Sequence, residues 1–343
     1  MSGFLTLPFL AVLFSVIATG ETAVSPYQGD SIDDAIVWVN PQNPADSLIL
    51  ATLKASNQKP VKPTGLLVYN LSGKQVQFLP GGTPNNIDIR YDIEIRGASQ
   101  PLIAASNWWS NDVSFYTVDS QTLEVRHILS NAPTGLSDLR GLCLYKNPLG
   151  ETHYFVIGED GQGEQYLLSE TGSAKLVNRY ELASAAEGCV VDDRMGRLYI
   201  SEEKKALWRF SADEVTRPPT RIMRTSWFGP LRADVEGLTI YQEPDGQGYL
   251  IASSQGNSQY LLFDRQENNY VGHFKIDPGL IDSVTGTDGI FASNRYLGNL
   301  YPEGVLIVQD HMNIVNGHPD NQNFKLIDWR NISIHLNRDL KNE

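Results

Sequence analysis

Basic residues are scarce in this sequence relative to acidic ones. Its 343 residues include 27 Lys and Arg against 40 Asp and Glu, which gives a formal net charge of −13. Nucleic acids and anionic membrane surfaces attract basic protein faces, so this balance argues against either as a partner. It fits bound cations or an ordinary soluble protein, and we expect a monomer.

Several common catalytic motifs are also missing. The sequence has no Gly-x-Ser-x-Gly elbow, no phosphate-cradling glycine loop and no His-Glu-x-x-His pair. Its six His residues are scattered and show no metal-ligand spacing. Any catalysis is therefore expected to depend on a metal held by carboxylates.

Cysteine is limited to Cys143 and Cys189. Counting with period two from Arg140 and Glu187 places the two thiols on opposite faces of their strands. This favours two buried free thiols, with a disulfide as the alternative. Neither cysteine has the neighbours of a metal thiolate or a nucleophile.

The N-terminal segment has no Lys or Arg before Lys54. Residues 4–17 are almost wholly apolar, and Ala18-Thr19-Gly20 provides the small residues that a signal peptidase recognises. This predicts a signal peptide over residues 1–20 and a secreted or periplasmic mature chain over residues 21–343. A membrane anchor is the alternative, although the apolar run is shorter than the ~20 residues that span a bilayer.

A repeated layout fills most of the chain. A polar residue followed by a short β-rich run recurs at steps of 54, 52, 47, 49 and 52 residues, at Asp34, Asp88, Arg140, Glu187, Glu236 and Asp288. Each is followed by a second apolar run that ends in a polar or aromatic residue, at Lys54, Trp108, Glu159, Glu203, Gln255 and Asp310. Six units of about four strands predict a single all-β domain, a six-bladed β-propeller. A pair of β-sandwiches is the alternative, but it does not explain the even spacing.

Residues 186–208 hold one repeat in its clearest form. Glu187 begins one strand and Glu203 ends the next, so both carboxylates lie at the same sheet edge. Asp234 and Glu236 are two residues apart and share a strand face. The four carboxylates would cluster at a channel mouth, where their pKa values must rise or hard cations must bind.

Other charged residues allow more than one interpretation. The adjacent Asp33 and Asp34 can be solubilising charge, and Asp88, Arg90 and Asp92 on one strand face require either internal ion pairs or a metal. The loop that contains Lys62 is locally basic and is a candidate lid over an anionic ligand, or simply a mobile loop.

The combination of motifs resembles the β-propeller phytases, the calcium-dependent alkaline phytase family. The resemblance covers residues 29–329. It depends on Asp33-Asp34, residues 85–92, residues 187–203, residues 234–241, residues 248–257, Asp288-Gly289, Gln309-Asp310 and residues 321–325.

The resemblance implies a function and a set of site residues. It implies removal of phosphate from phytate by a water that calcium activates, without a covalent phosphoenzyme, and with several calcium ions. It implies that catalytic calcium is bound by Glu187, Glu203, Asp234, Glu236 and Asp288, and that further calcium sites use Asp33, Asp34, Asp310 and Asn313. Lys54 is implied as a phosphate ligand.

The sequence departs from the family at its phosphate-binding positions. The family has arginine where this chain has Trp108, lysine where it has Glu159, and tyrosine where it has Arg140. Arg140, Lys62 and Lys204 are candidate replacements. The main expectation is a phytase that acts on phytate or lower inositol phosphates. One alternative is a non-catalytic calcium propeller that binds phosphorylated ligands or a protein. Another is a different metal-assisted hydrolase, such as a lactonase.

Overall fold

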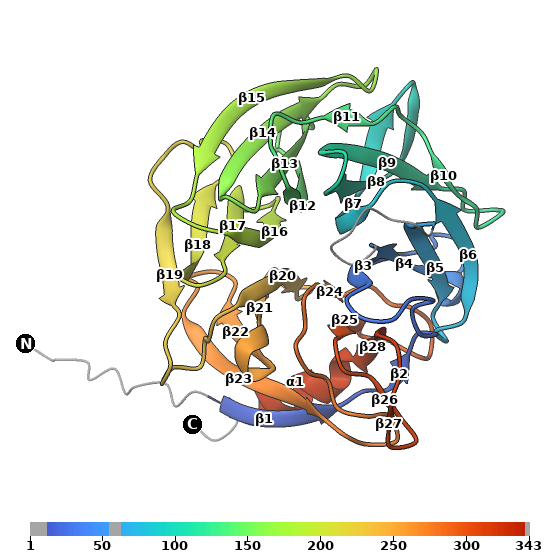
Figure 1. Ribbon diagram of the computed structural model, residues 1–343, viewed down its shortest axis with the longest axis vertical. Coiled ribbons are helices and arrows are strands. Elements are labelled where there is room, and N and C mark those ends of the chain that lie inside the picture. Colours follow the sequence, from blue (N-terminus) through green and yellow to red (C-terminus); the bar gives the residue numbers. More distant parts are fainter. Residues whose placement is uncertain (1–11, 55–62, 340–343) are drawn as a thin grey trace, which may run out of the picture.

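Six small sheets radiate around a common centre in the computed structural model of the protein, which describes residues 12–54 and 63–339 (Figure 1). The innermost strands of neighbouring sheets contact one another in a closed ring. This confirms the prediction of an all-β, six-bladed propeller.

The first three blades follow the chain in order. Blade one consists of β3 (Ile32–Trp38), β4 (Leu48–Leu53), β5 (Gly65–Asn70) and β6 (Gln75–Pro80). Blade two consists of β7 (Pro84–Ile95), β8 (Ala98–Asn107), β9 (Asp112–Val118) and β10 (Val125–His127), with β11 (Ala132–Pro133) also paired to β9. Blade three consists of β12 (Leu139–Lys146), β13 (Thr152–Gly158), β14 (Gln162–Leu168) and β15 (Ala174–Glu181).

Two of the last three blades include a strand from the N-terminal segment. Blade four consists of β16 (Ala186–Asp192), β17 (Arg197–Glu202), β18 (Ala206–Ser211) and β19 (Thr220–Arg224). Blade five consists of β20 (Val235–Gln242), β21 (Gly248–Ser254), β22 (Gln259–Asp264), β23 (Tyr270–Asp277) and β1 (Val12–Ile17). Blade six consists of β24 (Ile290–Ser293), β25 (Val305–Asp310), β28 (Asn323–Asp328) and β2 (Gly20–Glu21). The remaining elements are a hairpin of β26 (Ile314–Val315) and β27 (His318–Pro319), helix α1 (Trp329–Asp339), and the 3₁₀ turns η1 (Pro44–Asp46) and η2 (Gln255–Asn257).

The hydrophobic core lies between the blades. The six apolar clusters each join two neighbouring blades. On β4, Ile49 and Ala51 pack toward blade six, whereas Leu48 and Leu50 pack toward blade two. Because successive side chains point to opposite faces, a strand that is buried on both faces needs an unbroken apolar run.

The N-terminal segment joins two blades. Strand β2 pairs with β28 and completes blade six, and β1 pairs in parallel with β23 of blade five. Phe14 of β1 is buried and stacks on Phe274 and His335, at ring centroid distances of 5.3 and 4.6 Å. The predicted signal peptide thus overlaps β1, and export stays a prediction from the sequence. No helix in the described part of the chain is long and apolar enough to cross a membrane.

A β-bulge interrupts the innermost strand near the start of five blades. The register shifts lie between Ile32 and Ala35, Pro84 and Ile87, Leu139 and Gly141, Ala186 and Cys189, and Val235 and Leu238. A bulge inserts an unpaired residue and turns the following side chains to the other face.

The two cysteines form a disulfide, so the expectation of free thiols is wrong. Cys143 on β12 and Cys189 on β16 are bonded, with 5.8 Å between their Cα atoms. The bulges explain the error, because each starting residue, Arg140 or Glu187, itself lies in a bulge, and strict period-two counting from it fails. The bond joins the inner strands of blades three and four.

Candidate active site

Carboxylates converge where the inner strands begin, at the end of the channel that we call the upper mouth. Two groups have carboxylate oxygens within 4.8 Å of one another: Glu159 with Glu187 and Glu203, and Glu203 with Asp234 and Glu236. Glu203 belongs to both groups. The structure thus brings together the four residues that the sequence predicts as catalytic, Glu187, Glu203, Asp234 and Glu236, and adds Glu159.

Close backbone packing holds these side chains in place. Glu187 lies in the bulge at the start of β16, and the next residue is Gly188. A Cβ at Gly188 would lie 2.1 Å from the carbonyl oxygen of Glu236. One blade further on, the Gly237 N–H donates to the carbonyl oxygen of Asp288 at 2.9 Å. A glycine after the acidic residue therefore lets the inner strands of blades four and five approach the next one closely.

The electrostatics of the upper mouth disfavour ionised carboxylates in the absence of a cation. Burial raises the pKa of Glu203, and Glu159 and Asp234 raise it further. Burial also raises the pKa of Glu236 well above its ordinary value, with further contributions from Glu187 and Asp288. Like charges in a partly desolvated site cost free energy unless they are neutralised, so this arrangement suits hard cations.

Buried atoms without partners support the same interpretation. Asp33 Oδ2 and Asn85 Oδ1 are buried and have no hydrogen-bond partner among the described residues. Asn85 Nδ2 donates to Glu187 Oε1 at 2.7 Å, which places this amide beside the carboxylates. Carboxylate and amide oxygens are the ligands that calcium prefers, so the donor set fits the cation that the fold family implies.

Asp33 and Asp288 border the two groups, Asp34 adjoins Asp33, and all three have other partners. Lys54 Nζ lies 2.5 Å from Asp33 Oδ1, and Asp34 accepts backbone hydrogen bonds from Ala35 and Ile87 at 2.9 and 3.2 Å. Gln255 Nε2 donates to Asp288 Oδ1 at 2.6 Å. Burial raises the pKa of Asp33 to about 7 although Lys54 opposes the shift, and burial together with Asp33 raises the pKa of Asp288 to about 7.

Asp310 and Asn313 lie in neither group and surround a buried lysine. Lys325 Nζ is 2.7 Å from Glu21 Oε2, 2.5 Å from Asp282 Oδ1 and 3.5 Å from Asp310 Oδ2. It also donates to Asn313 Oδ1 at 2.8 Å. The ammonium group of Lys325 thus supplies positive charge where the sequence predicts a peripheral calcium site.

The three positions at which the sequence is expected to depart from the family that it resembles lie beside one another. The Arg140 guanidinium carbon is 5.5 Å from the centroid of the Trp108 ring. Arg140 Nε lies 3.2 Å from Glu159 Oε2, and Nη2 lies 3.3 Å from Asp138 Oδ1. Arg140 also borders Glu187, which contributes to raising the arginine's pKa. A cation supported by an indole ring thus faces the carboxylates, whereas Lys62 lies outside the described residues.

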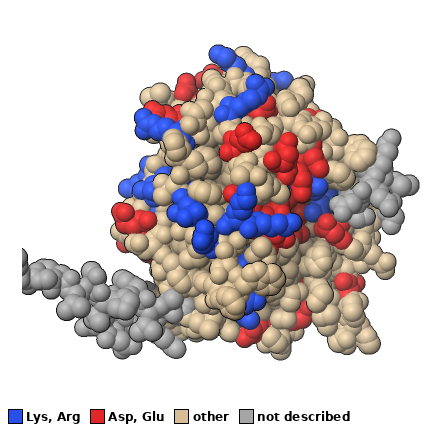
Figure 2. Space-filling view, turned by 60° about the vertical axis from the view of Figure 1, so that its left-hand side comes forward, with Lys and Arg blue, Asp and Glu red and all other residues tan. Residues whose placement is uncertain are grey.

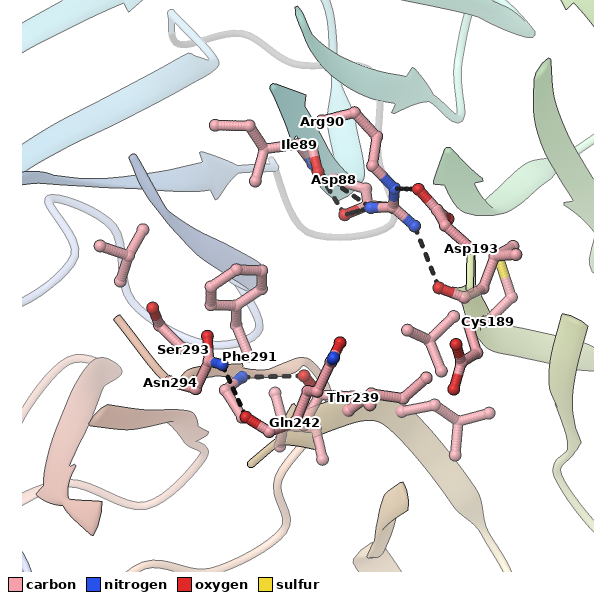
Figure 3. Close-up of a pocket in the computed structure, with 18 of the residues that line it drawn as sticks. Asp88, Ile89, Arg90, Cys189, Asp193, Thr239, Gln242, Phe291, Ser293 and Asn294 are labelled. Carbon is pink, nitrogen blue, oxygen red and sulfur yellow. Dashed lines mark hydrogen bonds and ion pairs between the residues drawn. The ribbon is translucent and has the colours of Figure 1, made fainter. Parts of the chain in front are cut away.

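The same inner strands end at a different environment, which we call the lower mouth. A cavity of about 340 Å³ is lined there by later strand residues, including Val37, Arg90, Val191 and Gln242. Arg90 lies 2.9 Å from Asp88 and 2.8 Å from Asp193 (Figure 3). It also donates to the Leu144 carbonyl oxygen at 2.6 Å. Asp88 and Arg90 of the second unit therefore form an internal ion pair. Asp92 is exposed, lies in a second irregularity of β7, and has no ion pair among the described residues.

Sequence reasoning missed the roles of three site residues, Glu159, Gln255 and Asn85, although the repeat register contains the first two. Glu159 and Gln255 occupy the same repeat position as Glu203 and Lys54, at the end of a blade's second strand. In blades two and five, this position contacts the channel residue of the next blade, as Trp108 contacts Arg140 and Gln255 contacts Asp288. Aligning the six repeats would have indicated these contacts, whereas nothing comparable signals the role of Asn85.

Fold and site together define a six-bladed propeller with a carboxylate-lined channel mouth, and comparisons with known proteins give its family. The phytase family model matches residues 11–343. The chain is 38% identical to a 3-phytase of Bacillus subtilis (strain 168) over 335 residues, which cover 94% of this chain and 86% of the relative. The chain therefore belongs to the phytase family, enzymes that hydrolyse phytate.

Two solved structures are similar at low sequence identity, and the first of them supports the fold alone. A protein of unknown function from Bacteroides thetaiotaomicron superposes with a TM-score of 0.53 at 11% identity, over 93% of this chain and 75% of the other. A functionally unknown protein from Desulfotomaculum acetoxidans has a TM-score of 0.49 at 12% identity, over 70% of each chain.

Proposed function

We propose that this protein is a calcium-dependent phosphomonoester hydrolase that removes phosphate from phytate or lower inositol phosphates by direct attack of water. The observation that carries the proposal is the pair of carboxylate groups that share Glu203 at the upper mouth. The similarity to a 3-phytase supports the substrate class.

Several calcium ions fit the residues of this mouth. Glu187, Glu203, Asp234 and Glu236 would hold ions in the two groups, and Asp288 lies close enough to affect the pKa of Glu187 and Glu236. When bound, calcium would supply positive charge beside the phosphate oxygens and favour ionisation of the attacking water. A polyanionic substrate could not otherwise enter a mouth whose carboxylates are ionised.

Arg140 and Lys54 would bind substrate phosphate. Arg140 presents a planar guanidinium that suits bidentate contact with phosphate oxygens, and the Trp108 ring limits its orientations. Lys54 is buried and already contacts Asp33 and Asp30. Because both cations are partly neutralised by neighbouring acids, this mouth should favour substrates with fewer phosphates than do family members that keep the arginine and lysine.

The proposed reaction balances without an enzyme-bound intermediate. The oxygen of water forms a bond to phosphorus, the bond between phosphorus and the inositol oxygen breaks, and that oxygen leaves as a hydroxyl after it takes up a proton. The products are inorganic phosphate and an inositol with one phosphate fewer. The two groups contain only Asp and Glu, which can accept the water's proton.

Phosphate release from phytate with and without calcium tests the proposed activity. We expect turnover with calcium and none after chelation. A chiral phosphorothioate ester then tests the direct attack, for which inversion at phosphorus is expected. Retention would show a phosphoenzyme, and tight calcium-dependent binding of phytate without turnover would favour a non-catalytic propeller.

A further inference from the structure

Blade four carries a basic region although the chain as a whole is acidic. Residues 204–232 contain seven Lys and Arg but only Asp213 and Glu214 as acids, a net charge of +5 within a chain of −13. Figure 2, which brings the left-hand side of Figure 1 forward, shows Lys and Arg gathered across the middle of this face beside a group of Asp and Glu. The average charge is therefore a poor guide to this part of the surface.

The strand register aligns the cations of this region. Trp208 pairs with Arg221 and Ala206 pairs with Arg224, with a bulge between them. Since Ala206 and Trp208 are two residues apart, their partners Arg221 and Arg224 share one face of β19. Both arginines are exposed, and neither has a carboxylate within ion-pair distance among the described residues. Lys204 is likewise exposed and lacks an ion pair in the described part of the chain.

Two large hydrophobic side chains project beside these cations. Trp227 is 86% exposed and Phe228 is 101% exposed. Their loop is fixed at its base, because the Ser226 N–H donates to the Leu231 carbonyl oxygen at 2.9 Å and Thr225 Oγ1 donates to the Lys204 carbonyl oxygen at 2.9 Å. An ordered loop that presents two adjacent aromatic residues to solvent is typical of a contact surface.

This surface lies next to the upper mouth. The loop leads within a few residues to Asp234, a member of the second carboxylate group. The Glu203-Lys204 step likewise joins a site carboxylate to a surface cation. A partner bound by this surface would lie beside the carboxylates that we assign to the candidate active site.

We propose that Lys204, Arg221, Arg224, Trp227 and Phe228, which we name the blade-four surface, dock the protein on an anionic phospholipid bilayer. Tryptophan and phenylalanine insert into the interface between headgroups and acyl chains, and neighbouring cations are attracted to anionic headgroups. Local charge thus replaces the expectation, drawn from net charge, that no membrane surface is bound. This proposal does not depend on the phosphatase activity.

Vesicle binding tests the proposal directly. The full-length protein is sedimented with phosphatidylcholine vesicles that do or do not contain phosphatidylglycerol. We expect cosedimentation with the anionic vesicles and a blue shift of tryptophan fluorescence that Trp227→Phe removes. Arg221→Gln/Arg224→Gln should weaken binding about thirtyfold, which corresponds to about 2 kcal/mol at about 1 kcal/mol for each cation. Trp227→Ser/Phe228→Ser should abolish it.

Matched controls distinguish binding through this surface from non-specific hydrophobic adsorption to vesicles. Leu280 is 107% exposed outside the blade-four surface, so Leu280→Ser should leave vesicle binding unchanged. Melting curves verify that each variant is folded. The proposal is overturned if the wild-type protein does not bind anionic vesicles, or if Leu280→Ser weakens binding as much as Trp227→Ser/Phe228→Ser does. It is also overturned if a calcium chelator abolishes vesicle binding while the arginine substitutions leave it intact. Self-association that Trp227→Ser/Phe228→Ser removes, without vesicle binding, would instead assign the surface to a second copy.

Discussion

The two mouths of the channel are built from the same inner strands but differ in how their buried charges are balanced. At the lower mouth, Arg265 contacts Asp192 through Nε at 2.6 Å and Nη2 at 2.7 Å, and both side chains are 2% exposed. At the upper mouth, carboxylates face one another, and Asp33 Oδ2 has no hydrogen-bond partner among the described residues.

This difference separates structural charge from functional charge. A buried carboxylate that serves the fold is matched by a cation from a neighbouring blade, as Asp192 is by Arg265. The upper carboxylates outnumber their cations, which leaves the free-energy cost of their charge to be offset by something bound. The same substitution, carboxylate to amide, should therefore affect stability at one mouth and activity at the other.

The largest expected effect is the loss of stability in Asp192→Asn. This variant leaves the Arg265 guanidinium buried without its counter-charge, and breaking a buried ion pair costs about 3 to 5 kcal/mol. Urea unfolding should show this decrease, while the folded fraction keeps the parental rate of phosphate release. A variant as stable as the parent would contradict the assignment of the lower pairs as structural.

The matched change at the upper mouth is Glu203→Gln. Because Glu203 belongs to both carboxylate groups, its loss should reduce calcium-dependent turnover about a hundredfold or more, ~2.7 kcal/mol in the barrier. Its melting temperature without calcium should stay the same or rise, since a like charge is removed. Parental turnover in this variant would show that the groups are only an acidic surface.

Calcium should stabilise the protein more at alkaline than at acidic pH. Asp33 and Asp288 have pKa values of about 7 in the metal-free fold, raised mainly by burial. Below about pH 4 these carboxyls are protonated whether or not the chain is folded. Between about pH 4 and about pH 7 the folded state keeps protons that the unfolded state releases. The free energy of unfolding of the metal-free protein therefore falls as the pH rises through this range. The carboxylates are then ionised and ready to bind.

Thermal melts with chelator and with calcium, at about pH 5 and about pH 8, measure this difference. One ion at about a hundred times its dissociation constant adds ~2.7 kcal/mol. The increase in melting temperature should therefore be larger at the higher pH. Equal increases in melting temperature at both pH values would show that Asp33 and Asp288 do not take part in calcium binding.

The smallest effect is expected for Trp108, which contacts Arg140 rather than the carboxylates. Removing its ring in Trp108→Leu should raise KM for phytate about five- to tenfold with little change in kcat, because the cation–π contact contributes ~1 kcal/mol. Trp108→Phe keeps an aromatic face and should restore most of the affinity. A fall in kcat with unchanged KM would place Trp108 in the reaction itself.

Sequence reasoning succeeded where the repeat carries the information. Six evenly spaced units predicted six blades, and acidic residues at equivalent strand ends predicted the meeting of Glu187, Glu203, Asp234 and Glu236. Both conclusions depend on a strand's position within a repeat, which tolerates errors of a residue or two.

Features that depend on single residues of register could not be predicted. The bulge between Ala186 and Cys189 reverses the face of Cys189 and brings it to Cys143. The ammonium group of Lys325, which contacts Asn313, comes from a strand paired across blade six rather than from a neighbour in sequence. No periodicity in the sequence indicates that a strand near the N-terminus pairs with β28.

That pairing affects how the chain reaches its final form. Thr19 Oγ1 donates to the Leu326 carbonyl oxygen across a separation of 307 residues. The other blades lie between the two strands of this pair in the sequence, so the ring closes only after the ribosome has made β28. Such distant contacts also slow folding, because a long loop must be ordered before they form. Until then blade six lacks its outer strand, and the nascent chain carries an open sheet edge that invites pairing with other chains.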